Sequence, residues 1–459
     1  MFDAFHAAGL EPHDYDGWIE MEGGRAPRLT PDGVRAITQR LRNAGEALRA
    51  RTVNDIVVAV DEAVARMVDD ADRRTRAVEL IARFSRCSIP MAAHVLDRMA
   101  AEWRAPALRQ LLDSEFRDPQ MLDAFRPVGT TGRLLHARGA RAALHIFAGN
   151  VPGVAVTSII RSLLVKCPVL GKTAATEPVT AVLFASALHA VDPALGQAVT
   201  VTYWPGGSRD IEGAAFHGVE QVVHYGSADA IAELRSRLPA HLTHVTHGHR
   251  ISFGMVGRDA IPDHTEASLL AQDVAYATAV FDQHGCVSPH TVFVEEGAFS
   301  PGELAALIDR ALHTIGQQLP AGPLAPSDAA AIRNTRTVAE FRAINGEKVS
   351  VMGPDRLDHT VIFDPVPALS ASCLNRTLKM CPVHHLEDVP QLVAPYRDVL
   401  QSVGLAGGAG RIPSLAQGLA SAGVSRISSF RDLPWPSAAW HHDGRGPLLE
   451  LVYWTETAL

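Results

Sequence analysis

The chain has 459 residues, of which 47% are hydrophobic and 20% are charged, and its formal net charge is -8. This composition is typical of a globular protein with room for two or three domains, and it lacks the basic surface that nucleic-acid binding requires. The most apolar stretch, residues 151–170, is interrupted by Arg161, Lys166 and two prolines, so we expect no membrane span.

The first six residues have neither a charged segment nor a long apolar core, which argues against a secretory signal. The five cysteines contain no Cys-x-x-Cys pair and no even framework. Reduced thiols in a cytoplasmic protein are therefore expected.

The N-terminal region is predicted to be helical. From Thr30 to about Arg109, apolar residues recur at helical spacing, with charged residues on the intervening positions. After Pro127, residues 129–141 are rich in Gly, Thr and Arg, which predicts a hairpin or an extended arm.

From Ala142 the pattern alternates between buried strands and helices. Strands are expected at residues 142–148, 168–172, 199–204 and 221–225, and helices at residues 154–165, 179–191, 210–216 and 228–238. This alternation predicts a parallel, doubly wound sheet that binds its ligand beyond the carboxyl ends of the strands. Asn150, Lys172, Gly206 and the pair Gly226-Ser227 all fall at such ends, so they indicate a nucleotide site.

A second α/β segment is expected from about Ile251 to Leu433. It includes a polar stretch at residues 327–338 and a predicted helix at residues 390–403, which the glycine-rich turn 404–410 would end. Residues 448–454 read as a strand tied into a sheet or across a subunit boundary.

Cys286 is the candidate nucleophile. A lone cysteine is more often a small buried hydrophobe. Here, however, Gly285 precedes it and Ser288-Pro289 follows, so a turn can expose the sulfur to backbone N–H groups that lower its pKa. His284 is either a base for this thiol or a residue that lines the site.

Two other patterns are weaker. Gly171-Lys172-Thr173 imitates a phosphate-binding loop, but Lys166 stands where that motif needs its first glycine. The four histidines of residues 241–249 match no zinc spacing, so no metal is expected, and residues 441–443 read as a loop.

These residues together resemble the aldehyde dehydrogenase superfamily, and within it the LuxC-type acyl-CoA reductase branch. The similarity is carried by residues 145–152, 171–178 and 283–289, with weaker support from residues 403–404, 423–426, 440–444 and 451–454. It covers the chain from about Arg126 onward.

The resemblance implies roles for individual residues. Cys286 corresponds to the nucleophile that forms a thioester or thiohemiacetal, and Asn150 to the side-chain donor of the oxyanion hole. Lys172 corresponds to a lysine that contacts the cofactor ribose, and Gly226-Ser227 to a pair that meets the pyrophosphate. The predicted cofactor contacts are Lys172, Thr173, Ala175, Gly206, Gly226 and Ser227.

Two departures from the family pattern affect the expected function. Thr246 stands where aldehyde-oxidising relatives carry a water-activating glutamate, although His247 or His249 could replace it. Ala175 stands where NAD-preferring relatives carry a ribose-binding glutamate, which favours NADPH over NADH, with Glu177 as a nearby alternative.

The resemblance thus implies NADPH-dependent reduction of an acyl thioester, on CoA or an acyl-carrier protein, to an aldehyde. The alternatives are oxidation of an aldehyde to the free acid, and a non-catalytic or acyl-transferring relative. A homodimer or homotetramer is expected, with an enzyme partner that delivers substrate as a further option.

The implied fold is aldehyde-dehydrogenase-like, with a Rossmann-like parallel-sheet cofactor domain, an α/β catalytic domain and a small strand element for oligomerisation. The expected parts are a helical segment (1–125), an arm (126–141), the cofactor domain (142–250), the catalytic domain (251–433) and a C-terminal strand segment (434–459).

Overall fold

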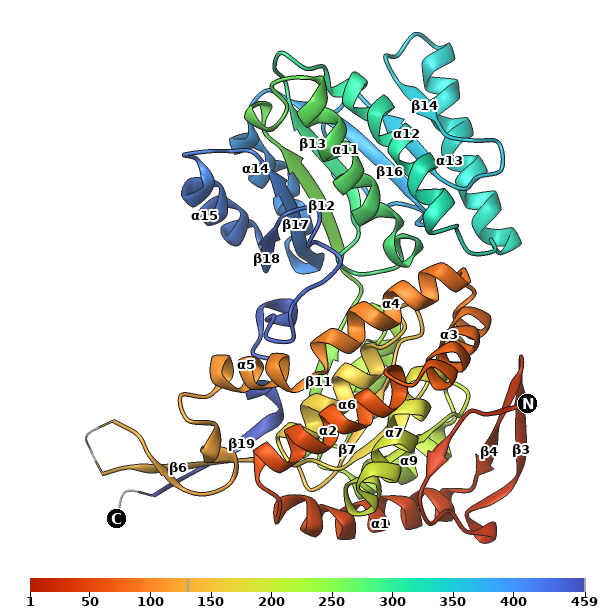
Figure 1. The fold of residues 1–459 in the computed structure, drawn as a ribbon, viewed down its shortest axis with the longest axis vertical. Helices are drawn as coiled ribbons and strands as arrows, with labels where there is room; N and C mark the ends of the chain where they lie inside the picture. The colour runs from red at the N-terminus through yellow and green to blue at the C-terminus, as the bar shows by residue number, and fades with distance from the viewer. Residues whose placement is uncertain (130–131, 458–459) are drawn as a thin grey trace. The chain divides into compact units, whose positions relative to one another are not determined.

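The computed structural model describes residues 1–129 and 132–457, and Figure 1 shows its helices and strands. The chain divides into two compact units. Unit 1 consists of Met1–Arg86, Ala92–Gly248 and Ser437–Leu459, and unit 2 consists of Cys87–Met91 and His249–Pro436. Residues 130–131 of the predicted arm and residues 458–459 of the predicted C-terminal segment lie outside the described residues.

Unit 1 is built on a six-stranded sheet with the order β11-β10-β7-β8-β9-β2. Five of its strands are parallel, and β2 is antiparallel to β9. The strands are β2 (His6–Ala7), β7 (Ala143–Ile146), β8 (Val169–Lys172), β9 (Val199–Thr202), β10 (Gln221–Tyr225) and β11 (Thr243–His247). The predicted doubly wound parallel sheet is therefore confirmed.

Helices cover both faces of this sheet. Leu144 and Ile146 of β7 belong to the apolar cluster that includes residues of α1 and α9. The intervening His145 faces α6, where its two ring nitrogens meet the hydroxyls of Ser158 and Ser162. The helices are α1 (Pro31–Arg49), α2 (Val53–Val68), α3 (Ala71–Ser85), α4 (Ile89–Glu102), α5 (Ala105–Glu115), α6 (Val154–Leu164), α7 (Val179–Val191), α8 (Pro193–Gly196), α9 (Arg209–Gly218) and α10 (Ala228–Arg235).

The first 29 residues contain no α-helix, which differs from the expected helical segment, and their one helical turn is a 3-10 turn at Pro12–Asp14. β4 (Gly24–Leu29) pairs with β1 (Phe2–Asp3) and with β3 (Tyr15–Met21). Thr30 then caps α1 by accepting a hydrogen bond from the backbone N–H of Gly33.

A second small sheet joins two distant parts of unit 1. β5 (Arg126–Pro127) and β6 (Leu134–Gly139) form an antiparallel hairpin, and β19 (Val452–Thr457) pairs with β6 along its whole length. Figure 1 shows β6 and β19 side by side. The predicted terminal strand thus exists and is tied into a sheet, but it begins four residues later than expected because residues 449–451 form a 3-10 turn.

Unit 2 contains a seven-stranded sheet with the order β14-β15-β16-β13-β12-β17-β18, parallel except for β14. Val292 and Val294 of β13 pack with α11 and α12, whereas Phe293 packs with α14 and α15 on the other face. The strands are β12 (Ile251–Val256), β13 (Pro289–Glu295), β14 (Ser350–Met352), β15 (Thr360–Phe363), β16 (Thr377–Val383), β17 (Leu400–Ala406) and β18 (Arg426–Ser428). The helices are α11 (His264–Ala279), α12 (Pro301–Gln318), α13 (Pro326–Ile344), α14 (Val389–Val393) and α15 (Ile412–Ala422).

The helix predicted at residues 390–403 is wrong in its second half. α14 ends at Val393, a 3-10 turn follows, and residues 400–406 form the buried strand β17. A short apolar run that is buried on both faces has no period that separates a strand from a helix. Gly407–Gly410 consequently follows a strand rather than a helix, and the polar stretch at residues 327–338 belongs to α13.

Candidate active site

Cys286 lies on a short connection between α11 and β13 in unit 2. The three residues before His284 all have left-handed backbone: φ is 57° at Phe281, 49° at Asp282 and 67° at Gln283. Each such residue costs roughly 1 kcal/mol when it is not glycine, so surrounding contacts must hold this turn in place.

The side chain of Gln283 supplies several of these contacts. It is fully buried, its amide nitrogen donates to the carbonyls of Pro289 (2.8 Å) and Thr377 (2.9 Å), and its amide oxygen accepts from the Thr377 N–H (2.8 Å). Asp282 accepts a 2.8 Å hydrogen bond from Nε of the buried Arg376. The turn before Cys286 is therefore fastened to the start of β16.

A second left-handed turn lies against the first. Leu374, Asn375 and Arg376 have φ values of 63°, 53° and 60°. The amide oxygen of Asn375 is 3.2 Å from Nε2 of His284, which fixes the imidazole two residues before Cys286. Consecutive strained residues that many contacts stabilise are typical of functional sites.

The backbone at Cys286 is anchored as well. Its carbonyl accepts a 2.7 Å hydrogen bond from Oγ of Ser252, at the start of β12. At Gly285, a Cβ would lie 3.0 Å from the ring of Phe281, so the close packing of the backbone against this ring explains the glycine.

Burial separates Cys286 from most other cysteines. Burial raises the pKa of the Cys87 thiol to about 12, and it also raises the pKa values of Cys167 and Cys381. Cys286 and Cys373 are half-buried; Cys87 is half-buried too, but desolvation of its thiol disfavours the thiolate. A reactive thiol needs access and a stabilised thiolate, so Cys286 is the better placed of the two because of its turn.

Asn150 lies in unit 1, where it is the exposed residue of the loop between β7 and α6. The carbonyl of Gly149 accepts a 3.1 Å hydrogen bond from Oγ of Thr176, and a Cβ at Gly149 would lie only 2.1 Å from that oxygen. Gly153, with φ of 93°, opens α6. The Asn150 loop is therefore fastened to the loop that follows Lys172.

The predicted cofactor residues lie at the carboxyl ends of the unit 1 strands. Lys172 ends β8, and burial lowers the pKa of its ammonium while the charge of Glu212 raises it. Ser227 caps α10 by accepting a 3.2 Å hydrogen bond from the Ala230 N–H. At Gly206, after β9, a Cβ would meet nothing within 4 Å. An open strand end, a lysine and a helix N-terminus suit a dinucleotide.

Thr173, a predicted cofactor contact, and Glu177, the alternative to Ala175, are both engaged within the protein. Thr173 is buried, and both its N–H and its hydroxyl donate to the carbonyl of Thr202, so it pairs β8 with β9. Glu177 is buried as the cap of α7, where its carboxylate accepts from the N–H and the hydroxyl of Thr180 (both 2.9 Å). Burial raises the pKa of Glu177 to about 7, against the lowering effect of these bonds. Ala175 is exposed.

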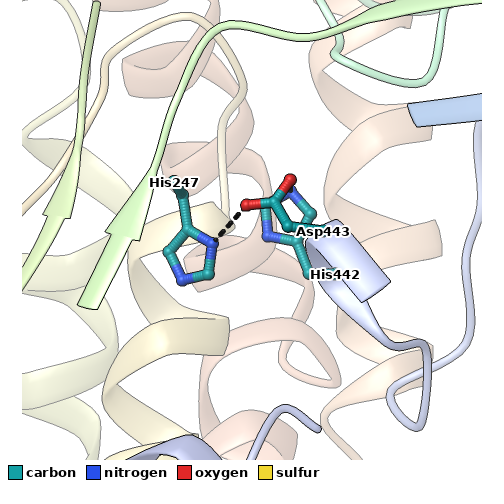
Figure 2. A group of neighbouring side chains, drawn as sticks. All are labelled: His247, His442 and Asp443. Carbon is teal, nitrogen blue, oxygen red and sulfur yellow. Dashed lines mark hydrogen bonds and ion pairs between the residues drawn. The ribbon is translucent and has the colours of Figure 1, made fainter. Parts of the chain in front are cut away.

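A buried cluster of side chains in unit 1 was missed at the level of sequence. Figure 2 shows His247, at the end of β11, beside His442 and Asp443. Nδ1 of His247 is 3.1 Å from Oδ2 of Asp443, and Nε2 is 3.6 Å from Oε1 of Glu450. The rings of Tyr225 and His442 stack on His247 at centroid distances of 4.5 Å and 4.6 Å.

This cluster restricts the chemistry of His247. Both ring nitrogens face carboxylates and aromatic rings cover the imidazole, so His247 is poorly placed to replace the glutamate that Thr246 lacks. The planes of His247 and His442 differ by only 9°, which prevents their in-plane lone pairs from converging on one metal ion. Arg445, 3.5 Å from Asp443, already supplies a cation. No sequence signal links residues 247 and 443.

The structure brings Asn150, Lys172, Gly206, Gly226 and Ser227 to one edge of a sheet in unit 1, whereas Cys286 belongs to unit 2. No helix among the described residues is long and apolar enough to cross a membrane.

Solved structures with this fold are numerous. NADP-dependent glyceraldehyde-3-phosphate dehydrogenase from Bacillus halodurans C-125, complexed with NADP, superposes with a TM-score of 0.76 at 15% identity, over 100% of this chain and 99% of that one. NAD-dependent benzaldehyde dehydrogenase from Corynebacterium glutamicum gives a TM-score of 0.74 at 15% identity, over 99% and 98% of the two chains. The predicted aldehyde-dehydrogenase-like fold is thus confirmed.

Sequence relatives are more specific. The long-chain acyl-protein thioester reductase of Vibrio harveyi is 26% identical over 310 residues, which cover 65% of this chain and 62% of the relative. The reductase of the same name from Photobacterium phosphoreum is 24% identical over 415 residues, which cover 84% of this chain and 76% of the relative. The matched regions therefore leave more than a third of the Vibrio harveyi protein uncovered. The family model described as acyl-CoA reductase (LuxC) matches residues 48–454, so the chain belongs to the LuxC acyl-CoA reductase family.

Proposed function

We propose that this protein reduces an acyl thioester to an aldehyde through an acyl group bound covalently to Cys286. The observation that carries the proposal is the strained turn that presents Cys286, held by Gln283, Arg376 and Ser252. Membership of the LuxC family supports a thioester as the substrate.

The first step is thiol exchange. The thiolate of Cys286 attacks the thioester carbonyl, the bond to the carrier sulfur breaks, and the released carrier thiolate takes up a proton. Asn150 donates a hydrogen bond to the oxyanion in this scheme, with the Cys286 N–H as the second donor.

The second step releases the product. A reduced nicotinamide, held by residues such as Lys172 and Ser227, would supply the hydride. The acyl group on Cys286 would then become a thiohemiacetal. Its collapse breaks the carbon–sulfur bond, leaves the aldehyde, and returns the sulfur as a thiolate. The thiohemiacetal oxygen remains an oxyanion until the carbon–sulfur bond breaks, so this step takes up no proton. The whole reaction therefore consumes one proton, which goes to the carrier thiol.

NADPH is the proposed form of the cofactor, and NADH is the alternative. Ala175 presents no carboxylate to repel a 2′-phosphate. The carboxylate of Glu177 is turned into the cap of α7, so it is not available to accept hydrogen bonds from a ribose.

The nature of the carrier and of the assembly is part of the same proposal. CoA and an acyl-carrier protein share the pantetheine thiol that Cys286 would displace.

We infer a cytoplasmic homodimer or homotetramer, with β5, β6 and β19 as the strand element for oligomerisation.

Aldehyde oxidation to a free acid is the competing function. It requires a base that activates water, but Thr246 stands at the position of that base, and His247 is held between Asp443 and Glu450. A non-catalytic or acyl-transferring role is the other alternative.

Intact mass spectrometry with an acyl-CoA, and separately with an acyl-carrier protein, tests the proposal. The wild-type protein should gain one acyl group, lose it on addition of NADPH, and release aldehyde. Cys286→Ser should show neither the mass increase nor aldehyde, while its NADPH affinity stays within about twofold because the cofactor residues lie in unit 1. Cys373→Ser serves as the matched control, and acylation of Cys286→Ser would contradict the proposal.

A further inference from the structure

A row of residues crosses the amino ends of the strands in the unit 2 sheet and links Cys286 to Arg426. Oγ of Ser252 donates to the Cys286 carbonyl (2.7 Å) and accepts a hydrogen bond from the Ser402 N–H (3.1 Å). Ser402 is in turn the register partner of Arg426, where β17 pairs with β18. Since neighbouring strands lie about 4.8 Å apart, the arginine backbone is roughly 10 Å from Ser252, within reach of its long side chain.

The guanidinium of Arg426 is fixed in place. It donates hydrogen bonds to the carbonyls of Leu433 (2.8 Å) and Asp432 (2.7 Å). Carbonyl acceptors orient a guanidinium without cancelling its charge. The carboxylate of Asp432 accepts a 2.7 Å hydrogen bond from the Ser429 hydroxyl.

We propose that Arg426 stabilises the thiolate of Cys286 electrostatically, so that the nucleophile is charged at neutral pH. This inference rests on the proposed function, because it assigns a positioning residue to the same nucleophile. A rigid cation near a half-buried sulfur favours the ionised form of the thiol.

The electrostatics of Arg426 agree with this assignment. Burial lowers the pKa of its guanidinium, whereas the charges of Asp432 and of a Cys286 thiolate raise it. An effect of the thiolate on the arginine implies an equal effect of the arginine on the thiolate, since the interaction between two charges is reciprocal.

Two other groups beside the turn add little net charge, Asp282 and His290. Asp282 is paired with Arg376, which leaves little net charge on that side. Burial, with a smaller contribution from His249, lowers the pKa of His290 to about 4, so its imidazole is neutral at pH 7. The titratable and charged groups on the neighbouring elements are His249 and Arg250 before β12, Asp282 and His284 on the turn, His290 in β13, Arg376 before β16, and Arg426 with Asp432 around β18.

The rate of alkylation of Cys286 by iodoacetamide as a function of pH tests this inference on the full chain, with peptide mass mapping to identify the modified thiol. The midpoint in the wild type should lie below the ordinary cysteine value of about 8.5. Arg426→Gln should raise it by about one pH unit.

Two further variants separate charge from structure. Arg426→Lys keeps the cation and should retain most of the depressed midpoint. Arg431→Gln removes an exposed guanidinium from the segment that follows β18, and it should leave the midpoint of Cys286 alkylation unchanged.

A wild-type midpoint at or above 8.5 would overturn the inference even if Arg426→Gln does not fold. The inference would also be overturned if Arg426→Lys and Arg426→Gln raised the midpoint of alkylation equally. The arginine would then act only through packing and not through its charge. Failure of the proposed function has a different signature: the protein would not be acylated by thioesters, although the midpoint still depended on Arg426.

Discussion

At the scale of single residues, Asn150 has the most testable role. Its loop is fixed by the contact between Gly149 and Thr176 and by the left-handed Gly153, so a change in the side chain alone should not move the backbone. The structural alternative is that Asn150 only shapes the entry into α6.

Asn150→Ala should lower kcat by about a hundredfold with little change in KM, because an oxyanion donor interacts more strongly with the transition state than with the ground state. Steady-state kinetics with an acyl-CoA measure both constants. The exposed Asn54→Ala is the control. A raised KM with kcat preserved would assign Asn150 to the structure of the loop instead.

The exposed position of Ala175 governs cofactor choice in our proposal. Ala175→Glu should place a carboxylate on the loop after β8, where it repels a 2′-phosphate and accepts hydrogen bonds from a 2′-hydroxyl. We expect the ratio of NADPH to NADH affinity to fall by about tenfold, which corresponds to roughly 1.4 kcal/mol. Fluorescence titration measures the ratio, with Ala175→Gln as the uncharged control. An unchanged ratio would remove this loop from the cofactor site.

At the scale of elements, the connection between α11 and β13 shows how a fold can store strain at a nucleophile. Three left-handed residues precede His284, and three more at residues 374–376 lie against them. Buried hydrogen bonds from Gln283 hold the two turns together.

Gln283→Ala should destabilise the protein by about 2 kcal/mol, because three buried hydrogen bonds are lost, those to the carbonyls of Pro289 and Thr377 and that from the Thr377 N–H. It should also slow alkylation of Cys286, since the turn relaxes. Chemical denaturation and alkylation rates provide the two measurements, and the exposed Gln317→Ala is the control. A variant that loses stability but alkylates at the wild-type rate would show that the turn does not position the thiol.

At the scale of the whole molecule, the C-terminal segment returns to unit 1 after the chain has completed unit 2. Glu115, at the end of α5, accepts hydrogen bonds from the backbone N–H groups of Leu448 and Leu449 (both 3.1 Å). The Asp443–His247 contact and the pairing of β19 with β6 hold the same segment.

Glu115→Ala should leave two backbone donors without their carboxylate and cost about 2–3 kcal/mol of unit 1 stability. Limited proteolysis should then cleave the chain near residues 445–450 faster than in the wild type. The exposed Glu46→Ala is the control. Equal cleavage rates in both variants would mean that the other two contacts are sufficient.

The sequence by itself determined the alternating part of the fold. The strands and helices between residues 142 and 238 were predictable because short apolar runs of strand length alternate there with longer segments of helix length. It also determined the candidates Cys286, Asn150 and Lys172, which stand beside glycines and at strand ends. At residues 400–403 the sequence predicted the end of a helix, and at residues 404–406 a turn, whereas the structure contains the strand β17.

Only the tertiary structure decided which side chains meet. The pairing of His247 with Asp443 spans 196 residues, and the contact of the turn before Cys286 with residues 374–377 spans more than 90. The row from Cys286 to Arg426 is likewise invisible in a linear chain. Such contacts depend on strand order and register, which are set by packing over the whole sheet rather than by local sequence.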